Sequence, residues 1–287
     1  MNLTITSENM GNPLLVGLLK KLTESFGRMN REFYIIGATA RDIILSQLIG
    51  TTSNRKTRDL DIAIAIPDWG AFEQIKLELV GDGFVKDRYM CQRFYYGDYE
   101  LDIVPYGIVA KEDDNIYWPP EETIAMSVKG FREVLSEAIT LNIDNEFDIK
   151  IASLHGLFLL KFNAWMDRHI STSKDAEDMS FIISNYFYAN LDRNIHSEVY
   201  NWEYFDEYIV GGYWLAYDLL TLLNKEQVAY YKSCIEKELK KEENSVLINQ
   251  ILEHSYGLNF DQVRDTWQTM VDVFQKSASC FASSDCE

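Results

Sequence analysis

The chain of 287 residues contains little cysteine and histidine, and it has no long apolar run. The four cysteines (Cys91, Cys234, Cys280 and Cys286) lack the spacing of a metal site, and nothing requires a disulfide, so we expect a reduced, cytoplasmic protein. The four histidines are scattered, and we assign none of them a role. No apolar run approaches the length of a membrane span, and the first ten residues lack the pattern of a signal sequence. We therefore expect no membrane partner.

Basic residues are also scarce, because 27 lysines and arginines stand against 45 acidic residues, for a formal net charge of −18. Broad binding of nucleic acid needs a positive surface, so this balance predicts no binding of duplex DNA. A local basic strip at a binding cleft is still compatible with it. The candidates for such a strip are Arg41, Arg55, Lys56, Arg58, Lys161, Arg168 and Lys174.

The apolar content is sufficient for a packed core, since 47% of the residues are hydrophobic and 13% are aromatic. Residues 1–152 alternate short strand patterns with helical patterns, whereas long helical patterns dominate from Ser153 onward. We predict an α/β (α+β) domain over 1–152 with a short mixed sheet, followed by a mostly helical domain over 153–287. No internal repeat is apparent.

The stretch 33–64 carries the strongest functional pattern. A short apolar strand ends at Gly37, a helix is predicted over 38–48, and a polar loop leads to a strand that begins Asp-Leu-Asp. Residues two apart in a strand point to the same face, so Asp59 and Asp61 present paired carboxylates. If the two strands are neighbours, the pair lies next to the Gly37 turn. Paired carboxylates usually require a cation, and a divalent metal ion is the common solution.

A third carboxylate follows in a predicted hairpin over 94–105. Its second strand carries Asp102 between apolar residues, which place this side chain in a sheet. Glu100 shares the face of Asp102, and we interpret it as a neighbour rather than a ligand.

The pattern of Gly37-Ala38, a helix and then Asp59-x-Asp61 resembles the nucleotidyltransferase superfamily of the polymerase-beta type. The signature of that superfamily is a Gly-Gly or Gly-Ser turn followed by Asp-x-Asp. Residues 37–42 are also similar to the Gly-Gly-x-x-Arg-Asp motif of CCA-adding enzymes. Ala38 departs from the pattern: it is small enough for a phosphate to approach the backbone, but it cannot offer a hydroxyl.

The resemblance extends to later residues. The superfamily supplies a third carboxylate from a later strand, and Asp102 matches that position. Lys161 and Arg168 share one face of a predicted helix, and Asp175 follows on the next. With Lys174 and Asp178, these residues resemble the later motifs of AbiEii-type nucleotidyltransferases, the toxin family of bacterial abortive-infection systems. Aminoglycoside nucleotidyltransferases carry a helical half of this kind too. The resemblance covers roughly residues 33–180.

The resemblance implies a metal-dependent transfer of a nucleoside monophosphate from a nucleoside triphosphate to an acceptor hydroxyl on RNA, protein or a small molecule. Two Mg²⁺ ions would lie on Asp59, Asp61 and Asp102. A cognate antitoxin is a candidate partner. The chain has no Walker-type lysine loop, which is consistent with this class. The residues implied in nucleotide or phosphate binding are Gly37, Ala38, Arg41, Lys161, Arg168 and Asp175, with Asp178 as the alternative to Asp175.

Each interpretation has a structural alternative. The paired aspartates could be a solvated strand end, the Gly37 turn could only cap a helix, and Lys161 could be a surface lysine. Arg41 and Arg168 could form ion pairs with the aspartates beside them. Two alternative functions stay open: an antibiotic nucleotidyltransferase of the aminoglycoside type, and a non-catalytic nucleotide-binding module with the same fold.

Overall fold

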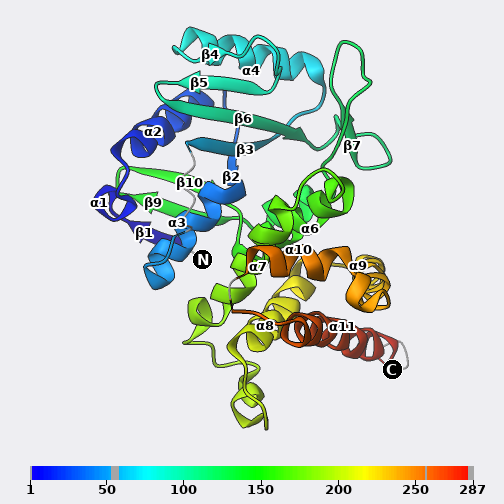
Figure 1. Cartoon of the computed structure of the whole chain (residues 1–287). Helices are drawn as coiled ribbons and strands as arrows, with labels where there is room; N and C mark the ends of the chain where they lie inside the picture. Colours follow the sequence, from blue (N-terminus) through cyan, green and yellow to red (C-terminus); the bar gives the residue numbers. More distant parts are fainter. Residues whose placement is uncertain (1, 53–57, 256, 284–287) are drawn as a thin grey trace. The chain divides into compact units, whose positions relative to one another are not determined.

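The computed structural model describes residues 2–52, 58–255 and 257–283 (Figure 1). Arg55 and Lys56 of the predicted basic strip lie outside these ranges. The chain divides into two compact units, Met1–Leu160 and Lys161–Glu287. The boundary between the units falls within helix α6 (Leu154–Arg168), eight residues after the boundary that the change in sequence pattern predicts.

The first unit is built on a mixed sheet with the strand order β1-β9-β10-β2-β3-β6-β5-β4 in the described part of the chain. Three neighbouring pairs are parallel (β1 with β9, β10 with β2, and β3 with β6), and the other neighbours are antiparallel. β7 and β8 form a separate pair. The strands are β1 (Asn2–Ile5), β2 (Tyr34–Ile36), β3 (Asp59–Ala65), β4 (Val85–Lys86), β5 (Arg93–Tyr96), β6 (Tyr99–Tyr106), β7 (Asn115–Tyr117), β8 (Ala125–Ser127), β9 (Ile139–Ile143) and β10 (Phe147–Ile151).

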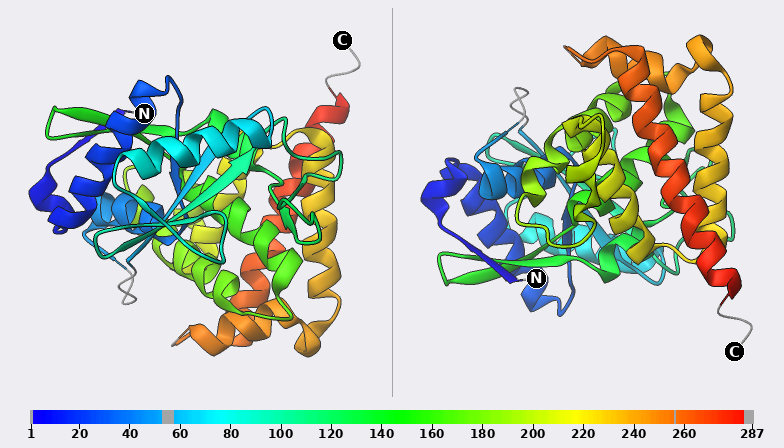
Figure 2. Two further views of the ribbon diagram at one scale, coloured as in Figure 1. Left: turned by 90° about the horizontal axis from the view of Figure 1, so that it is seen from above. Right: turned by 90° about the horizontal axis from the view of Figure 1, so that it is seen from below.

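Five helices of the described residues precede α6, and α4 lies over the sheet in both Figure 1 and Figure 2. Ser25 of α2 donates a hydrogen bond of 2.5 Å to Asp82, which ends α4, so these two helices are neighbours. The helices are α1 (Ser7–Met10), α2 (Pro13–Arg28), α3 (Gly37–Ile49), α4 (Trp69–Gly81) and α5 (Phe131–Ser136).

The centre of the sheet has one apolar face and one polar face. Leu60 and Ile62 of β3 are fully buried, as are Leu101 and Ile103 of β6. The residues that alternate with them are half-buried aspartates and a glutamate. This alternation is the strand pattern that the sequence predicts, and it leaves the polar side chains together on one face.

The second unit is helical, which confirms the predicted change of character. Its helix α11 packs along α8 and α9, and α9 and α11 run side by side in the right view of Figure 2. The elements are α7 (Lys174–Tyr186), η1 (Tyr188–Asn190), η2 (Ser197–Asn201), α8 (Glu207–Leu222), α9 (Lys225–Leu239), η3 (Glu242–Asn244), α10 (Val246–His254) and α11 (Phe260–Ser283).

A pair of glycines allows the close packing of α8. A Cβ on Gly211 would lie 2.4 Å from the carbonyl oxygen of Ile183 in α7, and one on Gly212 would lie 2.4 Å from Cγ2 of Thr266 in α11. Neither position therefore accepts a side chain without a shift of its neighbour. These glycines have a packing role inside the helical unit.

The helix predicted over 38–48 and the hairpin predicted over 94–105 are confirmed as α3 and the β5–β6 pair. The stretch 122–135, which no clear pattern assigns, contains β8 and most of α5. β1 was not predicted, and it joins the sheet beside β9. None of the helices in the described ranges is both long enough and apolar enough to cross a membrane.

Candidate functional site

Gly37 and Asp61 are in direct contact at the junction of β2, α3 and β3. β2 is antiparallel to β3, with Ile36 paired to Asp61, so the chain turns into α3 beside that aspartate. Gly37 has a φ of 72°, and a Cβ on it would lie 2.2 Å from Oδ2 of Asp61. Both the backbone conformation and the contact therefore require glycine at this position.

The N-terminus of α3 is directed at this contact. Its N-cap residue, Ile36, makes no side-chain capping bond, and its first turn carries no acidic residue. The hydroxyl of Thr39 donates a hydrogen bond of 2.9 Å to the carbonyl oxygen of Asp59, which fixes the first turn to β3. A helix N-terminus carries a partial positive charge and attracts anions such as phosphate. Ala38, the second residue of α3, has only a methyl side chain, which leaves the helix end accessible.

Four carboxylates lie on one face of β3 and β6, which we term the carboxylate face. These strands are parallel, with Asp59 paired to Glu100 and Asp61 paired to Asp102. Paired residues of neighbouring strands project to the same side, and so do residues two apart in one strand. The structure thus brings together the three predicted aspartates, with Glu100 as a fourth acidic neighbour.

Arg93 of β5 neutralises part of this face. It is paired with Asp102 across the antiparallel β5–β6 ladder. Its Nε and Nη2 donate to the two oxygens of Asp102 at 2.8 and 2.7 Å, and its Nη1 lies 2.6 Å from Oε2 of Glu100. The hydrogen bonds to Asp102 raise the pKa of the Arg93 guanidinium. Bidentate pairs of this kind are among the stronger polar contacts in proteins.

The side chains of the carboxylate face are of the type that binds metal ions, but they are not arranged as a metal centre in this structure. Carboxylate oxygens are the ligands that Mg²⁺ prefers. Among the described residues, however, no three Asp, Glu, His or Cys side chains converge closely enough to hold a metal ion. Both oxygens of Asp102 accept hydrogen bonds from Arg93 instead. The predicted role of Asp59, Asp61 and Asp102 as metal ligands stays a prediction.

Arg41 lies in the body of α3, where only 4% of its surface is exposed. Its Nε donates to Oδ1 of Asp42 at 2.9 Å. The ion pair that the sequence leaves open as an alternative is therefore present. A contribution of Arg41 to phosphate binding stays a prediction.

The predicted residues of the helical half form a group of their own in the second unit. Lys161 Nζ lies 2.6 Å from Oδ2 of Asp178, and it lies 3.5 Å from Oδ1 of Asp175. Arg168 holds Asp175 with two hydrogen bonds of 2.7 and 2.8 Å. The side chain of Asp175 is fully buried. α6 and α7 thus bring these four residues together as an ion-pair cluster, and their predicted nucleotide contacts stay untested.

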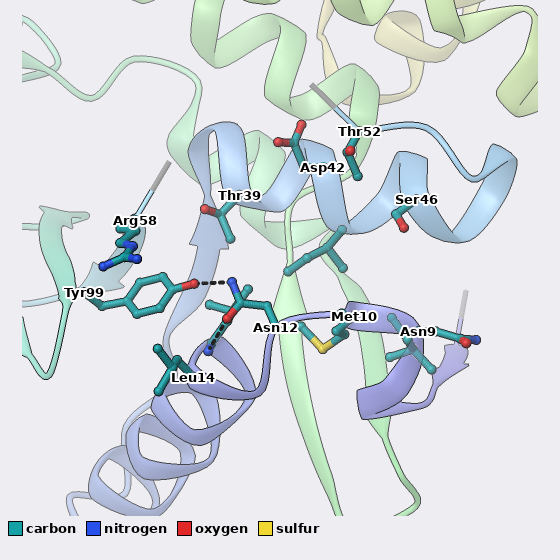
Figure 3. Close-up of a pocket in the computed structure, with 14 residues that line it drawn as sticks. Asn9, Met10, Asn12, Leu14, Thr39, Asp42, Ser46, Thr52, Arg58 and Tyr99 are labelled. Carbon is teal, nitrogen blue, oxygen red and sulfur yellow. Dashed lines mark hydrogen bonds between the residues drawn. The ribbon is translucent and has the colours of Figure 1, made fainter. Parts of the chain in front are cut away.

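A pocket of about 450 Å³ lies in the first unit against α3 (Figure 3). Thr39, Asp42 and Ser46 line it from α3, and the turn between α1 and α2 lines the facing side. There the Asn12 amide donates a hydrogen bond to the Tyr99 hydroxyl (dashed in Figure 3). The three candidate aspartates are not among the residues that line this pocket. Thr39 links the pocket to β3, because this residue lines the pocket and its hydroxyl donates a hydrogen bond to the carbonyl oxygen of Asp59.

The sequence patterns above do not single out Arg93, although the register of the β5–β6 hairpin indicates its position. The β5–β6 hairpin turns through Gly97 and Asp98, with Tyr96 paired to Tyr99. Counting back three pairs from this short loop places residue 93 opposite Asp102. The predicted hairpin began one residue too late, at Phe94, and so did not include the arginine.

No protein-family model matches the chain, and no curated protein matches it. Two solved structures do, and both are of ANT(2'')-Ia. The crystal structure of ANT(2'')-Ia in complex with adenylyl-2''-tobramycin is 15% identical, with a TM-score of 0.39, over 60% of this chain and 89% of that one. The solution structure of the antibiotic-resistance factor ANT(2'')-Ia is 16% identical, with a TM-score of 0.39, over 66% of this chain and 94% of that one.

Proposed function

We propose that this protein is a metal-dependent nucleotidyltransferase whose first unit carries the catalytic carboxylates. The observation that supports this best is the contact between Gly37 and Asp61. It places the positive end of α3 directly beside a carboxylate that is paired in register with Asp102. A helix N-terminus suits a phosphate, and neighbouring carboxylates suit a divalent cation. A nucleoside triphosphate with its metal ion needs both at the same place.

In this proposal Asp59, Asp61 and Asp102 hold Mg²⁺, with two ions expected. Bound Mg²⁺ would neutralise charge on the triphosphate and lower the pKa of the acceptor hydroxyl. The backbone of Gly37 and Ala38 binds the phosphates, because a glycine and a residue with only a methyl side chain let them approach the helix end. The acceptor oxygen forms a bond to the α-phosphorus, the bond from that phosphorus to the leaving oxygen breaks, and pyrophosphate departs. The proton of the acceptor hydroxyl passes to water in the same exchange.

The contribution of the protein in such a reaction is positioning and charge stabilisation, so no histidine or cysteine nucleophile is required. Lys161 and Arg168 of the second unit contact Asp178 and Asp175 there. The acceptor distinguishes two forms of the proposal. An AbiEii-like toxin would mark a hydroxyl on RNA or protein and would have a cognate antitoxin, whereas an antibiotic nucleotidyltransferase would mark a small molecule.

The test is a transfer assay with the full-length chain. Each of the four labelled ribonucleoside triphosphates is incubated with Mg²⁺ and with total RNA, a protein lysate or an aminoglycoside panel that includes tobramycin, and pyrophosphate release is measured in parallel. Wild type should label one acceptor class, and chelation should stop it. Asp61→Asn should lose the activity, whereas Asp148→Asn, a change on the exposed side of β10 in the same sheet, should keep it.

The outcomes separate the alternatives. Label in RNA or protein supports the toxin form, and label in an aminoglycoside supports the antibiotic form. Triphosphate binding that depends on Mg²⁺ but releases no pyrophosphate with any acceptor would contradict the enzyme and favour a non-catalytic binding module.

A further inference from the structure

A positively charged side chain of the protein itself, Arg93, lies against the carboxylate face. Arg93 projects from β5 beside β6, and its guanidinium contacts Asp102 and Glu100 at once. Only 24% of the Arg93 side chain and 19% of the Asp102 side chain are exposed. This bidentate pair is therefore well shielded from water, at the position where the third carboxylate of the proposed metal centre lies.

Charge explains why an arginine is useful here. Asp59, Asp61, Glu100 and Asp102 project from the same face of two neighbouring strands, and like charges so close together disfavour ionisation and folding. The guanidinium of Arg93 offsets this repulsion at the β6 side of the face. A divalent cation on Asp102 would have to bind an oxygen that now accepts a hydrogen bond from Arg93, beside a positive charge.

We propose that Arg93 is an internal counter-ion that competes with divalent metal for Asp102. Metal binding to the carboxylate face releases Asp102 from Arg93, and the released guanidinium keeps its partner Glu100. In the metal-free protein Arg93 stabilises the sheet, and it sets the metal affinity below what the carboxylates alone would give. Arg93 is in this sense a positioning residue: it acts on the metal through Asp102. The inference rests on the proposed metal-dependent function, which it deepens.

The test measures metal binding directly, without nucleotide or turnover. The full-length protein is titrated with Mn²⁺ by calorimetry, and thermal unfolding is followed with and without Mn²⁺. Arg93→Gln should bind Mn²⁺ about tenfold more tightly than wild type, because a strong competing pair is lost. The same variant should unfold at a lower temperature without Mn²⁺ and recover when Mn²⁺ is added.

A matched control is available in the second unit. Arg193 makes a bidentate pair with Asp218, with two contacts of 2.8 Å, and its side chain is 8% exposed. Arg193→Gln should lower the unfolding temperature without changing the Mn²⁺ affinity or recovering with Mn²⁺. Adding Asp102→Asn to Arg93→Gln should remove the gain in affinity, which locates the competition at Asp102.

An Arg93→Gln variant that binds Mn²⁺ no more tightly than wild type would overturn the inference, as would the absence of Mn²⁺ binding in both proteins. If Arg93→Gln does not fold, Arg93→Lys decides the matter: a single ammonium cannot make the fork of bonds, so its Mn²⁺ affinity should lie above that of wild type. Tighter Mn²⁺ binding without any nucleotide transfer would contradict the proposed function and leave the competition intact. Nucleotide transfer by an Arg93→Gln variant whose Mn²⁺ affinity is unchanged would support the proposed function and contradict the competition.

Discussion

The Cα of Gly37 packs against the carboxylate of Asp61, so closely that a Cβ on residue 37 would lie 2.2 Å from Oδ2. The contact joins the start of α3 to the middle of the sheet, because Ile36 and Asp61 are paired across β2 and β3. A glycine that looks like a simple turn residue in the sequence thus determines where a helix N-terminus meets the carboxylate face.

Replacing Gly37 should therefore harm both stability and function. We expect Gly37→Ala to lower the free energy of unfolding by about 1–3 kcal/mol, because alanine at positive φ is strained and its methyl group displaces Asp61. Urea denaturation measures the cost, and the transfer assay measures the loss of activity. Ala38→Ser is the control: it introduces only a small hydroxyl and should change stability by no more than about 0.5 kcal/mol. Equal stability and activity for Gly37→Ala and wild type would refute the assigned role of the contact.

The cluster around Lys161 leads to a different expectation from the one that the sequence alone supports. From the sequence, Lys161→Ala should weaken triphosphate binding without unfolding the helical half. In the structure Lys161 neutralises the nearly buried Asp178 and lies near the fully buried Asp175. We expect Lys161→Ala to destabilise the protein by about 2–4 kcal/mol, because a buried carboxylate loses a cationic partner.

Denaturation of Lys161→Ala, Asp178→Asn and the double variant measures the coupling of this pair. The double variant should recover part of the loss, since it removes both charges. Lys174→Ala, at an exposed position, should change stability by about 0.5 kcal/mol or less. Nucleotide affinity is measured at a temperature where all variants are folded. An unchanged dissociation constant for Lys161→Ala would assign the lysine a structural role only.

Ser25 should stabilise the fold at neutral pH, and this contribution should be lost in acid. Its hydrogen bond to Asp82 is the largest cause that lowers the pKa of this aspartate in the folded protein, and Lys21 and Arg28 act in the same direction. A lowered carboxyl pKa stabilises the fold above the unfolded value of about 3.9, and the contribution is lost as the pH falls through the folded value. We expect Ser25→Ala to lower the free energy of unfolding by about 1.5 kcal/mol at pH 7.

The difference between Ser25→Ala and wild type should shrink as the pH falls below about 4, when Asp82 becomes protonated in both proteins. Urea denaturation across pH 3 to 7 checks the trend. Thr23→Ala is the control on the same helix, because the Thr23 hydroxyl donates to a carbonyl oxygen, that of Leu19, rather than to a carboxylate. A gap between Ser25→Ala and wild type that is constant over this pH range would show that Asp82 is not responsible.

Duplex DNA should not bind measurably at physiological salt. The net charge of −18 and the sequence pI of about 4.6 oppose association with a polyanion. Filter binding or fluorescence anisotropy with random duplex DNA tests this, and an RNA oligonucleotide is compared under the same conditions. Tight binding to the duplex that weakens steeply with salt would reveal a basic strip that the overall charge conceals.

The sequence by itself determined the secondary-structure elements and the order in which the candidate functional residues occur along them. The strand that ends at Gly37, the helix after it, the Asp-x-Asp strand, the hairpin that carries Asp102 and the helical second half were all recognisable, because periods of 2 and 3.6 residues and turn residues are local properties. Only the tertiary structure decided which strands are neighbours and which charges meet. It paired Asp61 with Asp102 and set Arg93 against both oxygens of Asp102. The pair of Arg168 with Asp175, in contrast, is one that the sequence had left open as an alternative. The partners in the sheet depend on register between residues that local patterns do not relate.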